Sequence, residues 1–220
     1  MIRSFLILTL TLVLVTAVAP AFAGQVKVTL RETCEVNSAE PIKVRDIASI
    51  QPLGKTADKL GDVVVGMGPL PGANRTIEAG YVIPFTNTNP ATGSFTAGSE
   101  IIDRTQEGGA QFGAVILVPG DLTGDLYPDC VIAAPSASSG ATAGAGTLTL
   151  FRSAGNGTFV TPAATDVYGP GSPTTDGAAG ASLAAADLDD DLIPDLVVGA
   201  PGPLDSLSLL PGQVEILHAQ

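Results

Sequence analysis

Short apolar runs separated by turn residues fill the first part of the chain. In residues 25–30, Val26, Val28 and Leu30 alternate with polar neighbours, the period of a half-buried strand. Apolar runs at 42–50, 61–67 and 75–83 have strand length, and Pro and Gly at 69–72 indicate a turn. A short helical turn is also expected at 56–60. This pattern predicts a small β-rich domain over residues 24–86.

The next segment, 87–110, is rich in Thr, Asn, Gly and Ser. Such a composition buries little apolar surface, so we predict a linker. Residues 101–103 form either a short strand or plain coil.

From residue 111 onward the chain repeats itself at a constant offset, which aligns Asp121 with Asp187 and Asp129 with Asp195. Two units, about 111–176 and 177–220, share the order strand, acidic loop, strand, Gly-rich turn, strand. The final strands, at 146–151 and 212–217, both alternate apolar and polar residues. Self-similarity at a fixed spacing is typical of a repeat architecture built from small sets of strands.

The acidic loops carry oxygen ligands at positions 1, 3, 5 and 9 of nine residues. Alternate side chains of a tight loop can converge on one point while the position-7 carbonyl turns inward, as in calcium loops. Without a cation the carboxylates would repel one another. The alternatives are solvated acidic turns, and magnesium, which demands stricter geometry. The predicted calcium ligands are Asp121, Thr123, Asp125, Tyr127 and Asp129 in the first loop, and Asp187, Asp189, Asp191, Ile193 and Asp195 in the second.

Charge is unevenly distributed along the chain. Residues 24–104 are nearly balanced, with eight Lys or Arg against nine Asp or Glu, whereas residues 105–220 hold thirteen acids against Arg152 alone. Such an acidic half would be repelled by nucleic acid, which is therefore excluded as a partner.

The first 23 residues have the features of an export signal. Arg3 precedes an apolar stretch that ends in Ala21-Phe22-Ala23, a small-x-small cleavage site. The alternative is a membrane anchor. We expect a mature protein that begins at Gly24, has no stable membrane insertion, and is secreted, periplasmic or at the cell surface. Export permits a Cys34–Cys130 disulfide, but Cys130 occupies an apolar position of the repeat.

No catalytic constellation is found. The chain lacks a nucleophile elbow and a phosphate-binding Gly-rich loop, and its one histidine, His218, is expected to be a frayed terminal residue. We therefore expect no enzyme, no catalytic residue, and no cofactor besides calcium.

The two units resemble FG-GAP repeats, the blades of the integrin α-subunit β-propeller. Phe112-Gly113, the acidic loops, Ala134-Pro135 and Gly199-Ala200-Pro201 carry the resemblance. It implies a calcium ion in each loop and a surface that binds proteins or carbohydrates. Two departures stand out: Leu126 and Leu192 replace the glycine at loop position 6, and Ala179-Gly180 replaces Phe-Gly.

The expected fold is therefore all-β: a small N-terminal domain followed by two propeller-type blades, too few to close a propeller. Open sheet edges would favour self-association. Residues 25–86 more weakly resemble the N-terminal region of the periplasmic chaperone for flagellar P-ring assembly.

We expect an exported calcium-binding repeat protein with a binding or adhesion role. The alternatives are the flagellar chaperone and a non-catalytic fragment of a larger cell-surface protein or enzyme.

Overall fold

The computed structural model describes residues 42–48, 62–69, 79–89, 94–102, 107–155, 158–203 and 211–219. Their regular structure consists of β-strands and one 3₁₀ helix, η1 (Ala164–Asp166). The strands form three separate sheets, none of which closes on itself. The expected all-β fold, with too few blades for a propeller, is confirmed.

The N-terminal sheet is built around its third strand. Its strands are β1 (Ile42–Ala48), β2 (Val63–Pro69), β3 (Tyr81–Asn89), β4 (Ser94–Ala97) and β5 (Ile101–Ile102). β3 pairs antiparallel with β2 along one edge, and with both β4 and β5 along the other.

The segment predicted as a linker contributes β4, β5 and the end of β3, so the linker prediction does not hold for these residues, whereas the expected alternative of a short strand at 101–103 agrees with β5. β3 extends to Asn89, Phe85 pairs with Ala97, and Val82 pairs with Ile101. The composition did not indicate strands here because the side chains of Thr96, Ala97 and Ile102 are exposed and add little buried apolar surface. A strand at a sheet edge needs only its backbone groups to pair, whereas the linker prediction rested on side-chain hydrophobicity.

The first repeat unit is a four-stranded antiparallel sheet. It consists of β6 (Val115–Gly120), β7 (Asp129–Ala134), β8 (Thr147–Phe151) and β9 (Val167–Tyr168), in that order. The second unit is a three-stranded sheet of β10 (Ser182–Ala186), β11 (Asp195–Ala200) and β12 (Gln213–Leu217). β11 and β12 begin and end at the positions that the repeat offset gives for β7 and β8, so the sequence repeat is a structural repeat.

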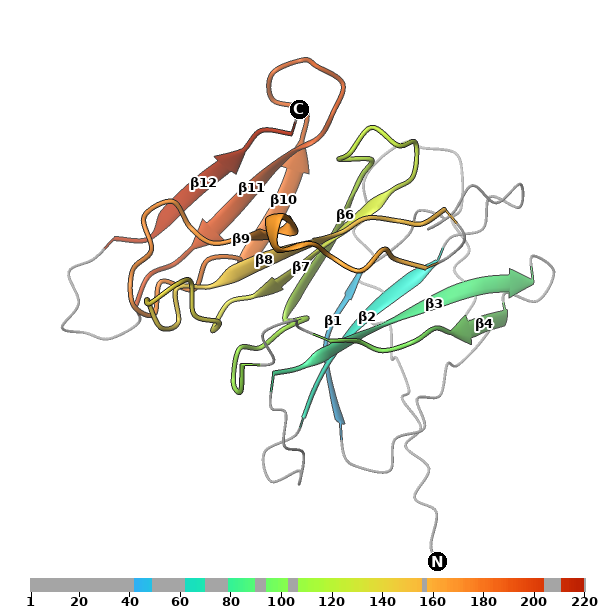
Figure 1. Ribbon diagram of the computed structural model, residues 1–220, viewed down its shortest axis with the longest axis horizontal. Coiled ribbons are helices and arrows are strands. Elements are labelled where there is room, and N and C mark those ends of the chain that lie inside the picture. Colours follow the sequence, from blue (N-terminus) through green and yellow to red (C-terminus); the bar gives the residue numbers. More distant parts are fainter. Residues whose placement is uncertain are drawn as a thin grey trace, which may run out of the picture.

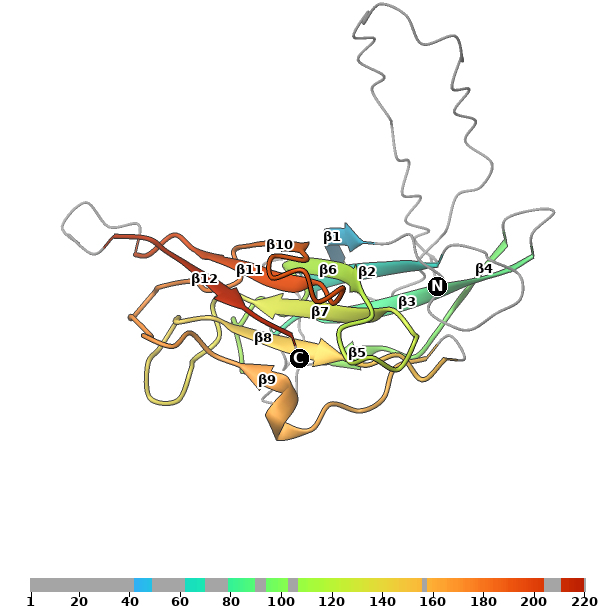
Figure 2. The same ribbon diagram turned by 90° about the horizontal axis from the view of Figure 1, so that it is seen from above.

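The three sheets lie in series, with the first unit in the middle (Figures 1 and 2). One face of the first unit shares a core with the N-terminal sheet, in which Ile132 and Phe151 meet Val64 and Val82. Its other face packs on the second unit through Val131, Ala133, Leu148, Leu196 and Val198. Each sheet is therefore buried by its neighbour in the series.

The Phe-Gly pair that opens the first unit makes the contact with the N-terminal sheet. Phe112 is buried, its N–H donates to the Ala79 carbonyl, and Gly113 lies against Gly66 and Val82. Gly113 has φ of 79°, a left-handed conformation that glycine adopts without strain.

The second unit keeps the same backbone with a smaller side chain. Gly180, φ 86°, donates to the Gly199 carbonyl as Gly113 does to Ala133. Ala179 is buried, donates to the Ala145 carbonyl and lies against Gly146.

Several predictions concern residues outside the described ranges: the export signal over 1–23, the strand at 25–30, Cys34 and the helical turn at 56–60. Cys130 is fully buried in the first core, as expected for a small apolar residue.

Candidate metal centre

Each acidic loop joins the first two strands of its unit. Residues 121–129 link β6 to β7, and residues 187–195 link β10 to β11. The two strands that flank each loop pair antiparallel, and this pairing fixes the distance between the two ends of the loop.

In the first loop, the position-1 carboxylate organises the backbone. Asp121 accepts hydrogen bonds at 2.6–3.1 Å from the backbone N–H groups of Thr123, Gly124, Asp125 and Leu126. At position 5, Asp125 accepts a 2.8 Å hydrogen bond from the N–H of Tyr127. The loop is therefore tightly wound around its own acidic side chains.

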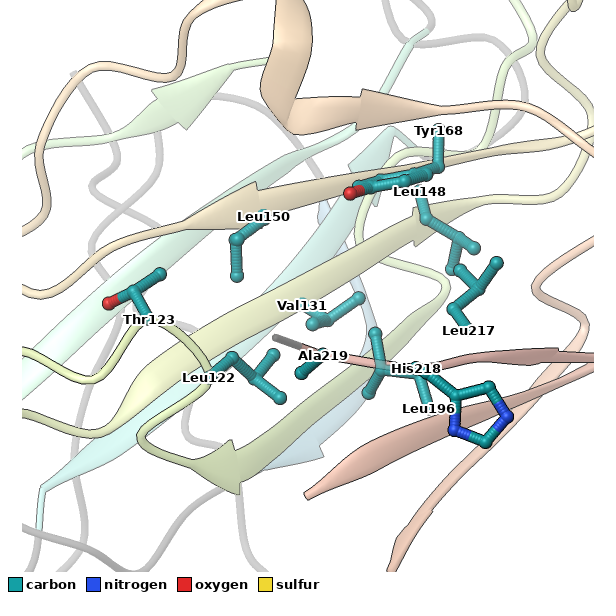
Figure 3. A pocket seen from close by; sticks show the side chains of 10 residues that line it. All are labelled: Leu122, Thr123, Val131, Leu148, Leu150, Tyr168, Leu196, Leu217, His218 and Ala219. Atoms are coloured by element: carbon teal, nitrogen blue, oxygen red, sulfur yellow. The ribbon is translucent and has the colours of Figure 1, made fainter. Parts of the chain in front are cut away.

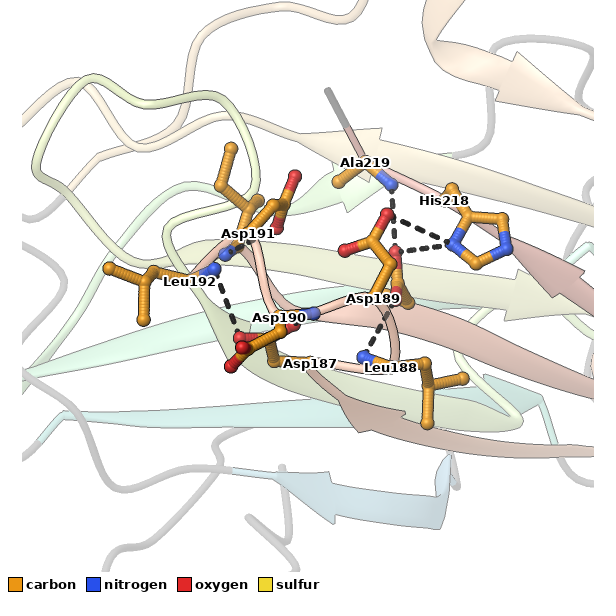
Figure 4. Close-up of polar contacts among 10 residues, drawn as sticks. Asp187, Leu188, Asp189, Asp190, Asp191, Leu192, His218 and Ala219 are labelled. Carbon is orange, nitrogen blue, oxygen red and sulfur yellow. Dashed lines mark hydrogen bonds and ion pairs between the residues drawn. The ribbon is translucent and has the colours of Figure 1, made fainter.

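The second loop repeats this arrangement (Figure 4). Asp187 accepts hydrogen bonds from the N–H groups of Asp190 (2.7 Å) and Leu192 (2.9 Å). Asp191 accepts a 2.8 Å bond from the N–H of Ile193. The sequence repeat thus preserves loop conformation as well as acidic residues.

Positions 4 and 6 of both loops have left-handed backbone conformations. Gly124 and Asp190 have φ of 75° and 66°, and Leu126 and Leu192 have φ of 73° and 72°. The loops therefore turn at position 6 with leucine in place of the glycine of the family pattern. Both leucine side chains point into solvent, with exposed fractions of 76% and 87%.

The position-9 carboxylates are buried and connect each loop to the end of the third strand. Asp129 accepts hydrogen bonds from the N–H groups of Leu122 (2.9 Å) and Ser153 (3.2 Å). Asp195 accepts them from Leu188 (2.9 Å) and Ala219 (3.2 Å).

The two buried carboxyl groups nevertheless differ in acidity. Burial raises the pKa of Asp129 and outweighs its hydrogen bonds from Leu122, Ser153 and Thr123, which lower it. Burial also raises the pKa of Asp195, but the N–H groups of Leu188 and Ala219 and the nearby His218 imidazole outweigh it, so that this pKa lies below its usual value.

Three of the predicted ligands lie close together in the second loop. Asp187, Asp189 and Asp191 each offer an oxygen within 4.8 Å of the others. In the first loop, Thr123 directs its hydroxyl to Asp129 at 3.2 Å. The backbone N–H groups of Tyr127 and Ile193 bond the position-5 carboxylates, and the ligand role of their carbonyls stays a prediction.

His218 is a site residue that sequence reasoning missed. Instead of fraying, it follows β12 directly, and its Nδ1 lies 3.1 Å from Asp195 Oδ1 and 3.6 Å from Asp189 Oδ2. The repeat offset could have indicated this position. It aligns His218 with Arg152, and the residue after Arg152, Ser153, donates its N–H to Asp129 at the end of the first loop.

A cavity of about 420 Å³ lies between the two units, beside the acidic loops (Figure 3). Its lining is mainly apolar, from Leu122, Val131, Leu148, Leu150, Leu196 and Leu217, with Thr123, Tyr168 and His218 as polar contributors.

Two blade-like sheets side by side, each with an acidic loop between its first two strands, are typical of β-propeller-type repeats. Residues 121–198, which include both loops, match the family model of the FG-GAP-like repeat. The expected repeat family is thereby confirmed for this part of the chain. FG-GAP repeats form a non-catalytic fold of binding and adhesion modules and are typically extracellular.

No curated protein matches the chain. The resemblance of residues 25–86 to the flagellar chaperone gains no support from either comparison. Among the described residues, no helix has the length and apolar character needed to span a membrane.

Proposed function

We propose that this chain is an exported, calcium-binding FG-GAP repeat protein with a non-catalytic binding or adhesion role. The observation that carries the proposal is the group of three carboxylates, Asp187, Asp189 and Asp191, in one loop clamped between paired strands. Calcium prefers six to eight hard oxygen ligands in a flexible arrangement. The donor chemistry of both loops fits this preference.

The second loop is the stronger of the two sites. Asp187, Asp189, Asp191 and Asp195 hold the ion together with the carbonyl of Ile193, and the ion offsets the repulsion among their charges. The first loop has Thr123 in place of the second carboxylate. Since more formal charge at a loop tightens calcium binding, the second loop fills first.

Thermal unfolding with calcium or with a chelator tests the metal. A ligand that binds only the folded state stabilises it by about 2.7 kcal/mol at a hundredfold excess over Kd, so the melting temperature rises with calcium. Asp189→Asn and Asp191→Asn each remove most of that rise, because each variant loses a proposed calcium ligand. Both side chains are exposed, so the fold tolerates these changes. Asp176→Asn, outside the loops, is the matched control. A folded protein whose melting temperature ignores both calcium and chelator would refute calcium binding.

The partner is a protein or a carbohydrate, as the repeat class suggests, and the second unit is the part of the chain most open to it. Val214 and Ile216 on β12 are 71% and 51% exposed, whereas their counterparts in the first unit, Leu148 and Leu150, lie between the two units. The face of the second unit that corresponds to the covered face of the first is therefore apolar and open.

The second unit is also the part of the chain that favours self-association. β12 has no further strand paired with its outer edge within the described residues, while β8 of the first unit pairs with β9. Exposed edges and apolar sheet faces favour pairing with another sheet, and a second copy offers an identical one.

Analytical ultracentrifugation tests this assembly. We expect concentration-dependent dimers that Val214→Glu and Ile216→Glu abolish. Val160→Glu, at an exposed apolar position outside the second unit, leaves the dimer intact. A monomer at all concentrations, with calcium present, would count against self-association and leave the calcium proposal unaffected.

A further inference from the structure

His218 brings a nitrogen donor to a loop otherwise made of oxygen donors. Its Nδ1 lies between two carboxylates, 3.1 Å from Asp195 Oδ1 and 3.6 Å from Asp189 Oδ2, and one atom from each of the three residues falls within 4.8 Å of the others (Figure 4). Two ligands about 2.1 Å from a tetrahedral ion lie about 3.4 Å apart. The two distances from Nδ1 bracket that value.

We propose that Asp189, Asp195 and His218 form a second cation site, selective for borderline divalent ions of the zinc class. Imidazole nitrogen suits zinc, nickel and copper, whereas all-oxygen sets suit calcium and magnesium. One histidine and two carboxylates leave a fourth position for water, and the partial exposure of His218 (48%) and Asp189 (42%) gives the ion a route of entry.

The buried member of the group is already oriented. Asp195 is fully buried, and the N–H groups of Leu188 and Ala219 bond its two oxygens at 2.9 and 3.2 Å. Such outer contacts fix a ligand carboxylate and are part of what makes a metal site. Asp189 and His218, in contrast, are partly exposed.

The first unit lacks this site for two reasons. The counterpart of Asp189 is Thr123, and the counterpart of His218 is Arg152, which cannot ligate a cation. Arg152 instead pairs with Asp166 at 2.8 Å. The chain therefore contains its own negative control at an equivalent backbone position.

A bound ion would connect two segments far apart in the sequence. Asp189 and Asp195 belong to the loop between β10 and β11, and His218 follows β12. The ion would add to the hydrogen bond from Ala219 to Asp195, which already ties the end of the third strand to the loop as the bond from Ser153 to Asp129 does in the first unit. Because Asp189 and Asp195 belong to both ligand sets, zinc and calcium compete for this loop, and zinc is therefore titrated without added calcium.

Zinc chloride titrated into the whole exported chain, without an affinity tag and with Cys34→Ser, tests the site. His218 is the only histidine, so ¹H–¹⁵N spectra contain one imidazole, and zinc should shift its Nδ1 resonance. By calorimetry, His218→Ala should weaken zinc binding by more than the roughly 10- to 100-fold that loss of an outer contact costs. Asp189→Asn, an exposed change that folding should tolerate, should weaken it similarly, whereas Asp121→Asn in the first loop should not.

An imidazole signal that does not move at saturating zinc would overturn the proposal, as would equal zinc affinity in His218→Ala. The same samples separate the two metals. Zinc binding without any effect of calcium on melting would reject the proposed calcium function and keep this site, and calcium stabilisation with no zinc binding would do the reverse.

Discussion

Leucine at position 6 of each acidic loop holds a conformation that costs folding energy. Leu192 has φ of 72° and its side chain is 87% exposed. A left-handed conformation costs a residue with a Cβ about 1–2 kcal/mol. Glycine escapes that cost but loses more backbone entropy on folding, by about 0.5–1 kcal/mol. Since little burial is lost with so exposed a side chain, Leu192→Gly should raise the free energy of unfolding by about 1 kcal/mol.

The measurement is thermal or urea unfolding in the presence of a chelator, so that strain is measured separately from metal binding. For a chain of this size, about 1 kcal/mol corresponds to a rise in melting temperature of about 2–4 °C. Leu192→Ala is the essential companion, because it removes the exposed side chain but keeps the Cβ in the left-handed region. Leu126, with φ of 73°, should respond in the same way, and the double variant should show nearly additive gains.

The same pair of substitutions at Leu188 supplies the control. Leu188 is in the same loop but not at positive φ, so glycine there should be less stable than alanine by about 0.5–1 kcal/mol. Glycine that is no better than alanine at position 192, while the Leu188 pair behaves as expected, would refute the strain argument.

Three further predictions concern other parts of the chain. Cys130 is fully buried, and burial together with the nearby Asp129 raises the pKa of its thiol. In a Cys34→Ser background it should therefore react with thiol reagents only after unfolding. Rapid labelling of the folded protein would contradict the placement of Cys130 in the core. Gly66→Ala should destabilise by about 1–3 kcal/mol because the new Cβ would meet the Gly113 carbonyl; unchanged urea unfolding would argue against this sheet contact. Protein recovered from the native host should begin at Gly24 by N-terminal sequencing, and an intact Met1 in a membrane fraction would refute export.

The repeat units could be predicted from the sequence because local pattern and spacing determine them. β7 and β11 follow their acidic loops at the same distance, and β8 and β12 begin one residue after the matching glycines Gly146 and Gly212. Position 6 was also predictable in part, since a family glycine indicates positive φ and both leucines have it.

The features that depend on contacts between distant segments were not predictable. β4 was missed, and residues 101–103 were left open between strand and coil, because edge strands pair through backbone groups and their side chains carry little signal. The position of His218 was missed because a residue near the end of a chain is usually frayed, and only tertiary packing shows that β12 brings it to Asp195. The packing of the first unit on the N-terminal sheet, through Gly66 and Gly113, leaves no periodic trace in the sequence.

The aspartate at position 9 holds each loop to the end of the third strand before any ion is considered. Asp129 does so with the Ser153 N–H and the Thr123 hydroxyl as donors. Asp195 keeps the equivalent backbone donor, Ala219, but meets His218 and lies near Asp189 where the first unit has a hydroxyl. The first unit surrounds its buried carboxylate with neutral donors, whereas the second unit places a further carboxylate, Asp189, and the His218 imidazole beside its own. A cation therefore changes the energy of the second loop more than that of the first, which is why the variants that distinguish the two loops, at Asp189 and His218, are the most informative ones.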